Sequence, residues 1–178
     1  MLNIDYPQPL VYLRKGLNYI DFESANTVTC TIKVTDQKNF NINISADTMI
    51  LSDGATLVDK HIENISCNGG SASFKVNVPE SGNYRMTISY SNNDEGGVHS
   101  YNVDLVERFV TVNVNGTQQN VWCRNTYSWD TVKTATMNME LSEGENTITF
   151  TNDGSVKFNN RDTYAPYIFS VTVNDICE

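Results

Sequence analysis

The sequence predicts an all-β protein, an antiparallel β-sandwich. Most of its segments alternate apolar and polar residues with a period of two, which is the pattern of a strand with one buried face. No long window repeats with the helical period of about 3.6 residues. Clusters of Pro, Gly, Asn and Asp separate the segments, and short strands at such spacing are typical of two stacked antiparallel sheets.

Each predicted strand is one of these alternating segments. In chain order they are Cys30–Val34, Phe40–Ile44, Phe74–Val78, Tyr84–Tyr90, Val110–Val114, Met137–Leu141, Ile148–Phe150 and Phe169–Val173. Asn115 and Gly116 form a dipeptide that favours a type I′ hairpin, because both central residues of that turn need a positive φ. Pro166 is expected just before the last strand, since proline cannot donate a hydrogen bond inside a sheet.

The stretch Asn120–Phe150 is predicted to carry the recognition residues. It opens with mixed aromatic and polar residues and continues into two alternating strands joined by the tight turn Ser142–Asn146. We interpret it as a loop mounted on a rigid hairpin. In β-proteins, loops held by a rigid scaffold are where binding residues concentrate.

An internal repeat suggests how the chain is divided. Leu13–Phe22 and Leu141–Phe150 share the frame L-x-x-G-x-N-x-I-x-F. The repeat predicts that residues 1–44 are an N-terminal β-hairpin appendage or the remnant of a preceding module, and that residues 45–178 are the sandwich. The boundary is expected between Phe40 and Asp47. Chance similarity of two glycine turns is the alternative.

Composition and charge limit the classes of function. The 178 residues, 39% of them hydrophobic, suffice for one domain or one domain with an appendage. A net charge of −9 without a basic stripe repels nucleic acid, so nucleic acid is not an expected partner. No apolar run approaches the roughly 20 residues of a membrane span. No secretory signal is visible at the start, and we interpret the chain as a segment of a longer one.

Residues with catalytic or metal-binding chemistry form no recognisable motif. Cys30, Cys67, Cys123 and Cys177 form no CxxC pair, and the two histidines lack ligand spacing, so a zinc site is not expected. Free thiols and one disulfide both remain open. Neither histidine accompanies a nucleophile in a known frame, and no glycine-rich phosphate loop follows a strand. We therefore expect that the chain is not an enzyme.

Six motifs from about Ser45 onward occur in the order found in a known family. They are Ala46–Leu51, Val78–Met86, Thr111–Gly116, Ser128–Thr131, Leu141–Ile148 and Ala165–Val173. Through them the chain resembles the carbohydrate-binding modules of families 35 and 6, which are β-sandwiches usually attached to glycoside hydrolases. The resemblance implies a jelly-roll sandwich of the galactose-binding-like type, a catalytic domain in the same parent chain, and a secreted or cell-surface location.

The resemblance also implies a sugar site and a metal site. Trp129 matches the loop tryptophan that stacks on a sugar ring in these modules, whereas a buried position beside the hairpin is the alternative. Asp47 matches the acidic first strand of the family and is the candidate ligand of a structural calcium ion. At the position where the last strand of the family contributes a calcium-binding aspartate, this chain has Phe169.

The residues expected to contact a ligand come from three loops. They are Trp129, Tyr127, Asn125, Arg124, Tyr164, Asn159, Arg161, Arg108 and Glu107, with His99, Tyr101, Asn160 and Tyr167 as further candidates. The loop before the last strand is expected to meet the loop of Trp129 at one end of the sandwich. Asn125 either hydrogen-bonds a sugar or caps its own turn, and Trp122 either binds or packs. The turn Asn92–Glu95 offers oxygen ligands for calcium or is simply solvated.

A non-catalytic carbohydrate-binding module is the function that these observations favour. It would bind a terminal neutral sugar or a short glycan weakly, by stacking on Trp129, and would hold an attached glycoside hydrolase near its substrate. The alternative is a structural or adhesive β-sandwich spacer without a ligand of its own, in which Trp122 and Trp129 would both be buried.

Overall fold

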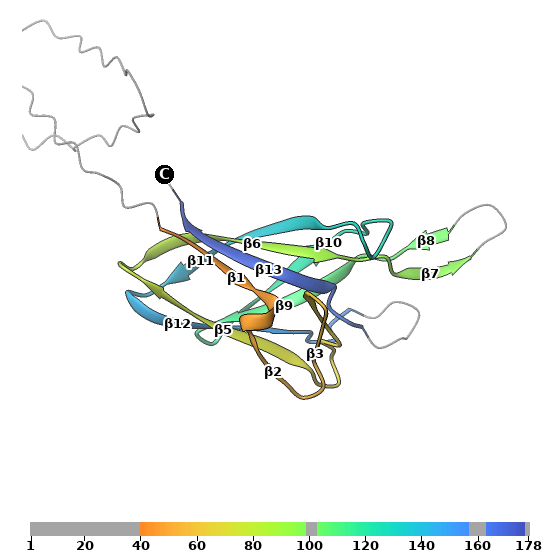
Figure 1. Ribbon diagram of the computed structural model, residues 1–178, viewed down its shortest axis with the longest axis horizontal. Helices are drawn as coiled ribbons and strands as arrows, with labels where there is room; N and C mark the ends of the chain where they lie inside the picture. Colours follow the sequence, from red (N-terminus) through yellow and green to blue (C-terminus); the bar gives the residue numbers. More distant parts are fainter. Residues whose placement is uncertain (1–39, 99–102, 157–162, 177–178) are drawn as a thin grey trace, which may run out of the picture. The chain divides into compact units, whose positions relative to one another are not determined.

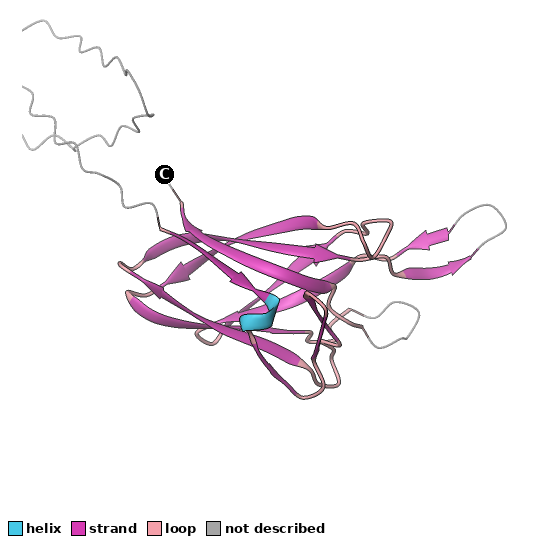
Figure 2. Ribbon diagram, viewed as in Figure 1, coloured by secondary structure: helices cyan, strands magenta, loops and turns pink. Residues whose placement is uncertain are grey.

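The computed structural model of the protein describes residues 40–98, 103–156 and 163–176. These residues form strands and one turn of 3-10 helix, η1 (Ala46–Thr48), as Figure 2 shows. The strands are β1 (Asn41–Ser45), β2 (Ile50–Ser52), β3 (Thr56–Val58), β4 (His61–Glu63), β5 (Ser71–Val78), β6 (Gly82–Ser91), β7 (Glu95–Val98), β8 (Val103–Leu105), β9 (Arg108–Val114), β10 (Thr117–Cys123), β11 (Lys133–Leu141), β12 (Gly144–Thr151) and β13 (Tyr167–Asp175). None of the described segments is a helix with the length and apolar character that a membrane crossing requires.

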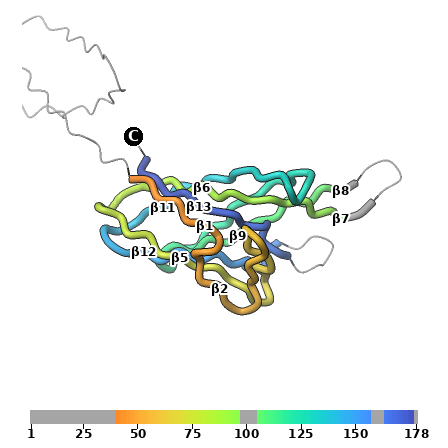
Figure 3. Tube along the Cα trace, in the orientation of Figure 1, coloured from red at the N-terminus to blue at the C-terminus, as the bar shows by residue number. Residues whose placement is uncertain are grey.

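The described strands form two antiparallel sheets that stack as a sandwich (Figure 1, Figure 3). One sheet has the order β11-β6-β13-β4-β3, and β1 also pairs with β13. The second sheet has the order β10-β9-β12-β5-β2. A separate ribbon of β7 and β8 extends beyond one end of the sandwich (Figure 1). The predicted all-β class and the antiparallel β-sandwich are confirmed.

The core lies between the two sheets, where the inward-facing residues of the long strands meet. Alternate residues are buried along Ala72–Val78 of β5 and along Tyr84–Tyr90 of β6. Phe74 and Phe150 pack edge-to-face, with ring centroids 5.4 Å apart. Burial of each large side chain of this kind contributes about 1.5–3 kcal/mol. The alternation that predicts the strands is therefore also what holds the sheets together.

β11 and β12 do not form the predicted hairpin. β11 pairs with β6 in one sheet, whereas β12 pairs with β5 and β9 in the other. The segment between them carries the chain across the sandwich, and the fully buried Asn146 fixes it. Its Nδ2 donates to the Ser142 carbonyl at 2.7 Å, and its Oδ1 accepts from the Ser142 N–H at 3.0 Å. The hairpin prediction is wrong because alternation identifies a strand but not its partner.

β9 and β10 form the hairpin that Asn115 and Gly116 predict. Their φ angles are 49° and 99°, both positive as a type I′ turn requires. Val114 pairs with Thr117 directly across this turn. Because β10 is the edge strand of its sheet, the hairpin determines which side chains line that flank of the sandwich.

The last strand contains a β-bulge that the sequence pattern does not show. Pro166 precedes β13, as predicted. The register with β6 shifts between Ile168 and Ser170, so Ile168 is buried and Phe169 is only partly covered. Phe169 lies against His61, with ring centroids 5.1 Å apart. The expectation that Phe169 continues the buried row of this strand is wrong, because a bulge reverses the alternation.

The sandwich includes residues on the N-terminal side of the expected boundary at residue 44. β1 pairs with β13, and Ile44 stands opposite Val171. Residues 1–39, with the repeat Leu13–Phe22, lie outside the described residues. The assignment of residues 1–44 as an appendage or a remnant of another module therefore stays a prediction.

Candidate functional site

The loops that follow β6, β10 and β12 meet at one end of the sandwich, which we term the loop end (Figure 1). Asn125, after β10, donates from Nδ2 to the carbonyl of Asp94, after β6, at 2.8 Å. Arg108, at the start of β9, donates to the carbonyl of Ala165, just before β13, at 3.1 Å. Residues far apart in the sequence thus share one surface.

Asn92 is fully buried, and it links its own segment after β6 to the segment before β9 and to the end of β10 with the loop that follows. Its Nδ2 donates to the carbonyl of Val106 at 2.9 Å and to that of Cys123 at 3.1 Å. Its own N–H donates to Thr126 Oγ1 at 3.0 Å. Buried polar groups need such partners, so Asn92 serves the fold. The expectation that it is a free oxygen ligand in an exposed turn does not hold.

The Asn125 amide uses both of its polar atoms within the protein. While Nδ2 contacts Asp94, Oδ1 accepts the Tyr127 N–H at 2.7 Å. This is the turn-capping role that the sequence left open. Tyr127 has a positive φ of 65° and is 69% exposed, with Lys133 Nζ 5.2 Å from its ring centroid. Tyr127 is therefore held by its backbone, and its ring is free to contact solvent.

Arg108 connects charged and aromatic groups of the loop end. Its Nε donates to Asp94 Oδ2 at 3.0 Å, and a second guanidinium nitrogen donates to the Ala165 carbonyl. The guanidinium carbon lies 5.0 Å from the ring centroid of Trp129 and 5.8 Å from that of Tyr164. These distances are within the range of cation–π contacts. Arg108 therefore lies close to both rings.

Trp129 is half-buried at the loop end, between the bare and the fully buried positions that the sequence left open. Its ring centroid lies 4.3 Å from that of Tyr167, and Tyr167 stacks in turn on His61 at 4.6 Å. His61 Nε2 is 2.8 Å from Glu63 Oε1. The two loops meet as expected. Much of the Trp129 ring, however, is already in contact with Tyr167 and Arg108.

A pocket of about 240 Å³ opens at this end, and we term it the loop-end pocket. Apolar, aromatic and charged side chains line it: Leu105, Val106, Phe109, Trp122, Val156, Thr163, Tyr164, Asp94, Glu95, Glu107 and Arg108. Trp122 is 47% exposed and Tyr164 42%, and Trp122 packs on the buried Phe109 with ring centroids 5.2 Å apart. Exposed rings beside fixed charges suit a small ligand with an apolar face and a polar rim.

No protein-family model matches the sequence, and no curated protein is similar enough to count as a relative. Solved structures are similar. A family 35 carbohydrate-binding module from Clostridium thermocellum has a TM-score of 0.61 and 26% identity over 75% of this chain and 98% of that module. For a family 35 module from Cellvibrio japonicus the values are 0.54 and 19%, over 75% and 92% of the two chains.

The fold is that of a family 35 carbohydrate-binding module. An exo-β-1,3-galactanase from Phanerochaete chrysosporium, determined with β-1,3-galactotriose, is also similar, at a TM-score of 0.59 and 19% identity. The similar region covers 75% of this chain but 29% of the enzyme. This chain therefore corresponds to whole non-catalytic modules and to part of an enzyme. The predicted resemblance is confirmed.

On the family 35 fold, the remaining expected ligand residues lie at the exposed rim or beyond the described residues. The side chain of Arg124 is 86% exposed, and its Nε lies 3.8 Å from Glu107 Oε1. Such an exposed ion pair contributes little to stability, so both side chains are free to exchange partners. The expected residues at positions 99, 101 and 159–161, Asn159 and Arg161 among them, fall outside the described residues.

Asp47 lies apart from the loop-end pocket, in η1. It is exposed, and its Oδ1 accepts a hydrogen bond from the Ser45 hydroxyl. Calcium takes about six to eight oxygen ligands. Among the described residues no group of three or more His, Cys, Asp or Glu side chains is placed to hold a metal ion. A structural calcium ion, and a role for Asp47 in binding it, stay predictions.

Trp122 takes a larger part in the loop end than sequence reasoning assigned to it. Its neighbours Val121 and Cys123 are buried and favour a packing role. However, Trp122 shares its alternation with Asn120 and Arg124, which are polar. Because successive side chains of a strand point to opposite faces, that parity was the signal that places the Trp122 ring on the outer face.

Proposed function

We propose that the protein is a non-catalytic carbohydrate-binding module that holds a terminal sugar or short glycan in the loop-end pocket. The observation that carries the proposal is the pairing of two exposed rings, Trp122 and Tyr164, with fixed charged groups on a family 35 fold. A pyranose has an apolar C–H face and a rim of hydroxyls. The rings would receive the face, and the charged groups the hydroxyls.

Arg108 is proposed to orient the ligand. A guanidinium carries five N–H donors, and the bonds to Asp94 and Ala165 use two of them. The proposed role of the others is to donate to ligand hydroxyls beside Tyr164. Because the Asp94 pair and the contact with Trp129 hold Arg108 in place, little side-chain freedom would be lost on binding.

The charges around the pocket favour a neutral sugar. Asp94, Glu95 and Glu107 are acidic and Arg108 is basic, so carboxylates outnumber cations among the lining residues. The net charge of the chain, −9, acts in the same direction. A uronate would be repelled by these carboxylates. Calcium, if bound here, would offset that repulsion and would make uronate binding sensitive to a chelator.

Attachment to a glycoside hydrolase is the proposed context, at the cell surface or in the secreted fraction. The partial match to the galactanase supports it, because there the same fold forms part of a longer enzyme. A tethered module raises the local concentration of glycan at the catalytic site. No chemistry by the module itself is needed for this effect.

Calorimetric titration with a panel of neutral and acidic glycans, with and without a chelator, tests the proposal. We expect dissociation constants in the high micromolar to millimolar range, or about −4 to −5.5 kcal/mol. Tyr164→Ala should weaken binding about tenfold or more, a loss of about 1.4 kcal/mol, because it removes a ring of the pocket.

Tyr127→Ala is the matched control. It removes a more exposed tyrosine that does not line the pocket, and it should leave the affinity unchanged. The proposal is wrong if no glycan binds, or if a folded Tyr164→Ala protein binds as tightly as the wild type.

A further inference from the structure

Three stacked rings lead from the outer face of the sheet that contains β4 and β13 to the loop end. The His61 and Tyr167 rings are nearly parallel, at 19°, with centroids 4.6 Å apart. The Tyr167 and Trp129 rings follow, with centroids 4.3 Å apart and an angle of 30°. We term His61, Tyr167 and Trp129 the ring column. Phe169 also contacts His61, at 5.1 Å, so the His61 ring has two aromatic neighbours on β13.

Alternation along β4 and β13 explains why these rings meet. Ile62 and Ile168 pair across the two strands, and both are fully buried. Because successive side chains of a strand point to opposite faces, the residues on either side of this pair face outward. They are His61, Glu63, Tyr167 and Phe169, and all of them are partly covered. Cross-strand neighbours on one face of an antiparallel pair contact one another.

Glu63 anchors the His61 end of the ring column. Its Oε1 lies 2.8 Å from His61 Nε2, and the side chains of His61 and Glu63 are only 17% and 23% exposed. Burial raises the pKa of Tyr167, the Glu63 carboxylate raises it further, and the Arg108 guanidinium lowers it. The Tyr167 hydroxyl is therefore within electrostatic range of a charge at each end of the column.

Arg108 stands at the other end of the ring column, beside Trp129. Its guanidinium carbon is 5.0 Å from the Trp129 ring centroid, within the range of a cation–π contact. Arg108 also lines the loop-end pocket, where its remaining N–H donors are proposed to contact the ligand. The ring column therefore connects the His61–Glu63 pair on β4 to a charged group of the pocket.

We propose that His61 is a positioning residue for the loop-end pocket, and that its ring acts through Tyr167 and Trp129 to hold Arg108 in place. His61 is not among the described residues that line the pocket. Without this ring, Tyr167 and Trp129 would gain side-chain freedom, and Arg108 would have to be ordered when the ligand binds. This inference rests on the proposed function and adds a residue to it that contacts no ligand.

Calorimetric titration with galactose, β-1,3-galactotriose, mannose, xylose and isomaltose tests the role of the ring. The sugar that the wild type binds most tightly is then titrated into the variants. His61→Leu keeps the apolar bulk but removes the flat ring, and it should weaken binding about threefold to tenfold, the strength of one aromatic contact. His61→Phe keeps a ring between Tyr167 and Phe169 and should restore binding to within about twofold of the wild type.

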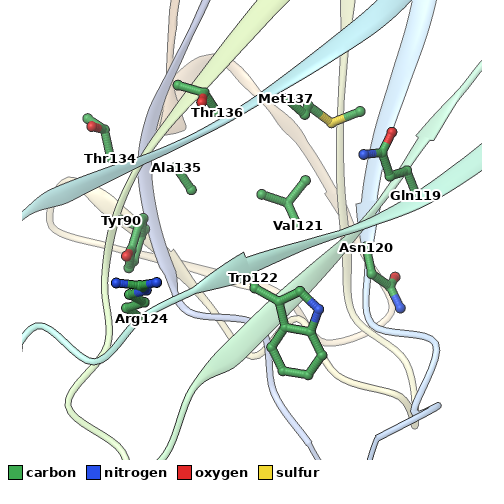
Figure 4. Close-up of a pocket in the computed structure, with 10 residues that line it drawn as sticks. All are labelled: Tyr90, Gln119, Asn120, Val121, Trp122, Arg124, Thr134, Ala135, Thr136 and Met137. Carbon is green, nitrogen blue, oxygen red and sulfur yellow. The ribbon is translucent and has the colours of Figure 1, made fainter.

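Thr136→Leu is the matched control, because it introduces the same leucine on the same sheet but outside the ring column. In Figure 4, Thr136 projects from the side of β11 opposite to Ala135, which packs on the core. Thr136 pairs with Thr87 in the middle of β6, whereas Tyr167 pairs with Ser91 at the end of that strand. This variant should leave the affinity unchanged.

The fluorescence of Trp129 provides a second readout, which a general loss of stability in a folded protein does not change. In a Trp122→Phe background Trp129 is the only tryptophan. We expect its emission to be red-shifted and more readily quenched by acrylamide after His61→Leu, and to return to the parent values after His61→Phe. Circular dichroism verifies that each variant is folded.

The outcomes separate the inference from the proposed function. Weaker binding and redder emission in His61→Leu, both restored in His61→Phe, support the inference. Unchanged affinity in a folded His61→Leu protein, or equal weakening by both substitutions, overturns it and leaves the proposed function standing. If His61→Leu does not fold, His61→Gln replaces it and is decided by the same outcomes, because it lacks the ring but keeps a polar partner for Glu63. If the wild type binds none of the sugars, the proposed function fails and the inference with it.

Discussion

Asn92 shows how much of the loop end depends on a single residue. Its buried amide bonds to segments that lie more than ten residues away along the chain, at Val106 and Cys123. A buried carbonyl that is left without a hydrogen-bond donor lowers the free energy of unfolding of the protein by about 1–3 kcal/mol. The positions of Arg108 and the rings beside it therefore rely on a residue that contacts no proposed ligand.

We expect Asn92→Ala to lower the free energy of unfolding by about 2–4 kcal/mol, because it leaves the buried carbonyl of Cys123 and the partly buried carbonyl of Val106 without this donor. Urea denaturation measures the change. Asn93→Ala is the control, because the side chain of Asn93 is partly exposed and does not donate the hydrogen bonds that Asn92 donates. This substitution should change the free energy of unfolding by less than about 0.5 kcal/mol. Equal effects of the two substitutions would show that Asn92 does not hold the loops together.

The sequence predicts some of these single residues and not others. Asn125 was recognised as a turn residue or a ligand, because asparagine often bonds its own backbone. Nothing local distinguishes Asn92 from Asn93, since their difference arises from contacts with distant segments. The partly covered position of Trp129 likewise depends on Tyr167, which arrives from the far end of the chain.

Among the elements, the β9–β10 hairpin has the clearest consequence for binding, because it positions Trp122. Its turn was predictable from two residues, since Asn and Gly tolerate positive φ. The crossing between β11 and β12 was not, although it also contains a glycine with positive φ, Gly144. A glycine turn permits a hairpin and a crossing alike, and the choice is made by which sheet each strand joins.

Gly116→Ala tests the importance of the hairpin turn. A Cβ at this position meets nothing within 4 Å, so the cost arises from φ alone, which is 99°. We expect the free energy of unfolding to fall by about 1–2 kcal/mol. Gly82→Ala, also in open space but without a positive φ, should be near neutral in the same urea titration. A neutral Gly116→Ala would indicate that the turn relaxes without strain.

At the scale of the whole molecule, the fold class was predictable, whereas the pairing of strands that are distant in the sequence was not. Period-two alternation is local, whereas the hydrogen bond from Thr172 to Asn43 joins residues 129 positions apart. The short strands β2, β3 and β4 escaped prediction because three residues are too few to show a period. The loop end is built from such long-range pairings, which is why its residue types were predicted better than its geometry.

Alkaline pH should destabilise the whole sandwich. Burial raises the pKa of Tyr84, Tyr90 and Tyr167 above the usual value of about 10, and it raises the pKa of the Cys123 thiol above about 8.5. The unfolded chain loses these protons first. Stability is therefore full below about pH 8.5 and falls as the pH rises through the raised values.

Urea midpoints between about pH 7 and pH 11 measure this decline. Cys67 and Cys123 are free thiols, and Cys123→Ala removes the buried one. In that variant the decline should begin nearer pH 10, where only the tyrosines contribute. A midpoint that stays constant to pH 11 would contradict the raised pKa values.

The two tryptophans of the chain can serve as intrinsic fluorescence probes. Trp122 is exposed to solvent on an edge strand, whereas Trp129 contacts Tyr167 and Arg108. Emission from the first should be red-shifted and readily quenched by acrylamide, and emission from the second should be bluer and protected. In Trp122→Phe only Trp129 remains as a tryptophan. A comparison of the emission of this variant with that of the wild type distinguishes sugar binding beside Trp122 from unfolding of the sandwich.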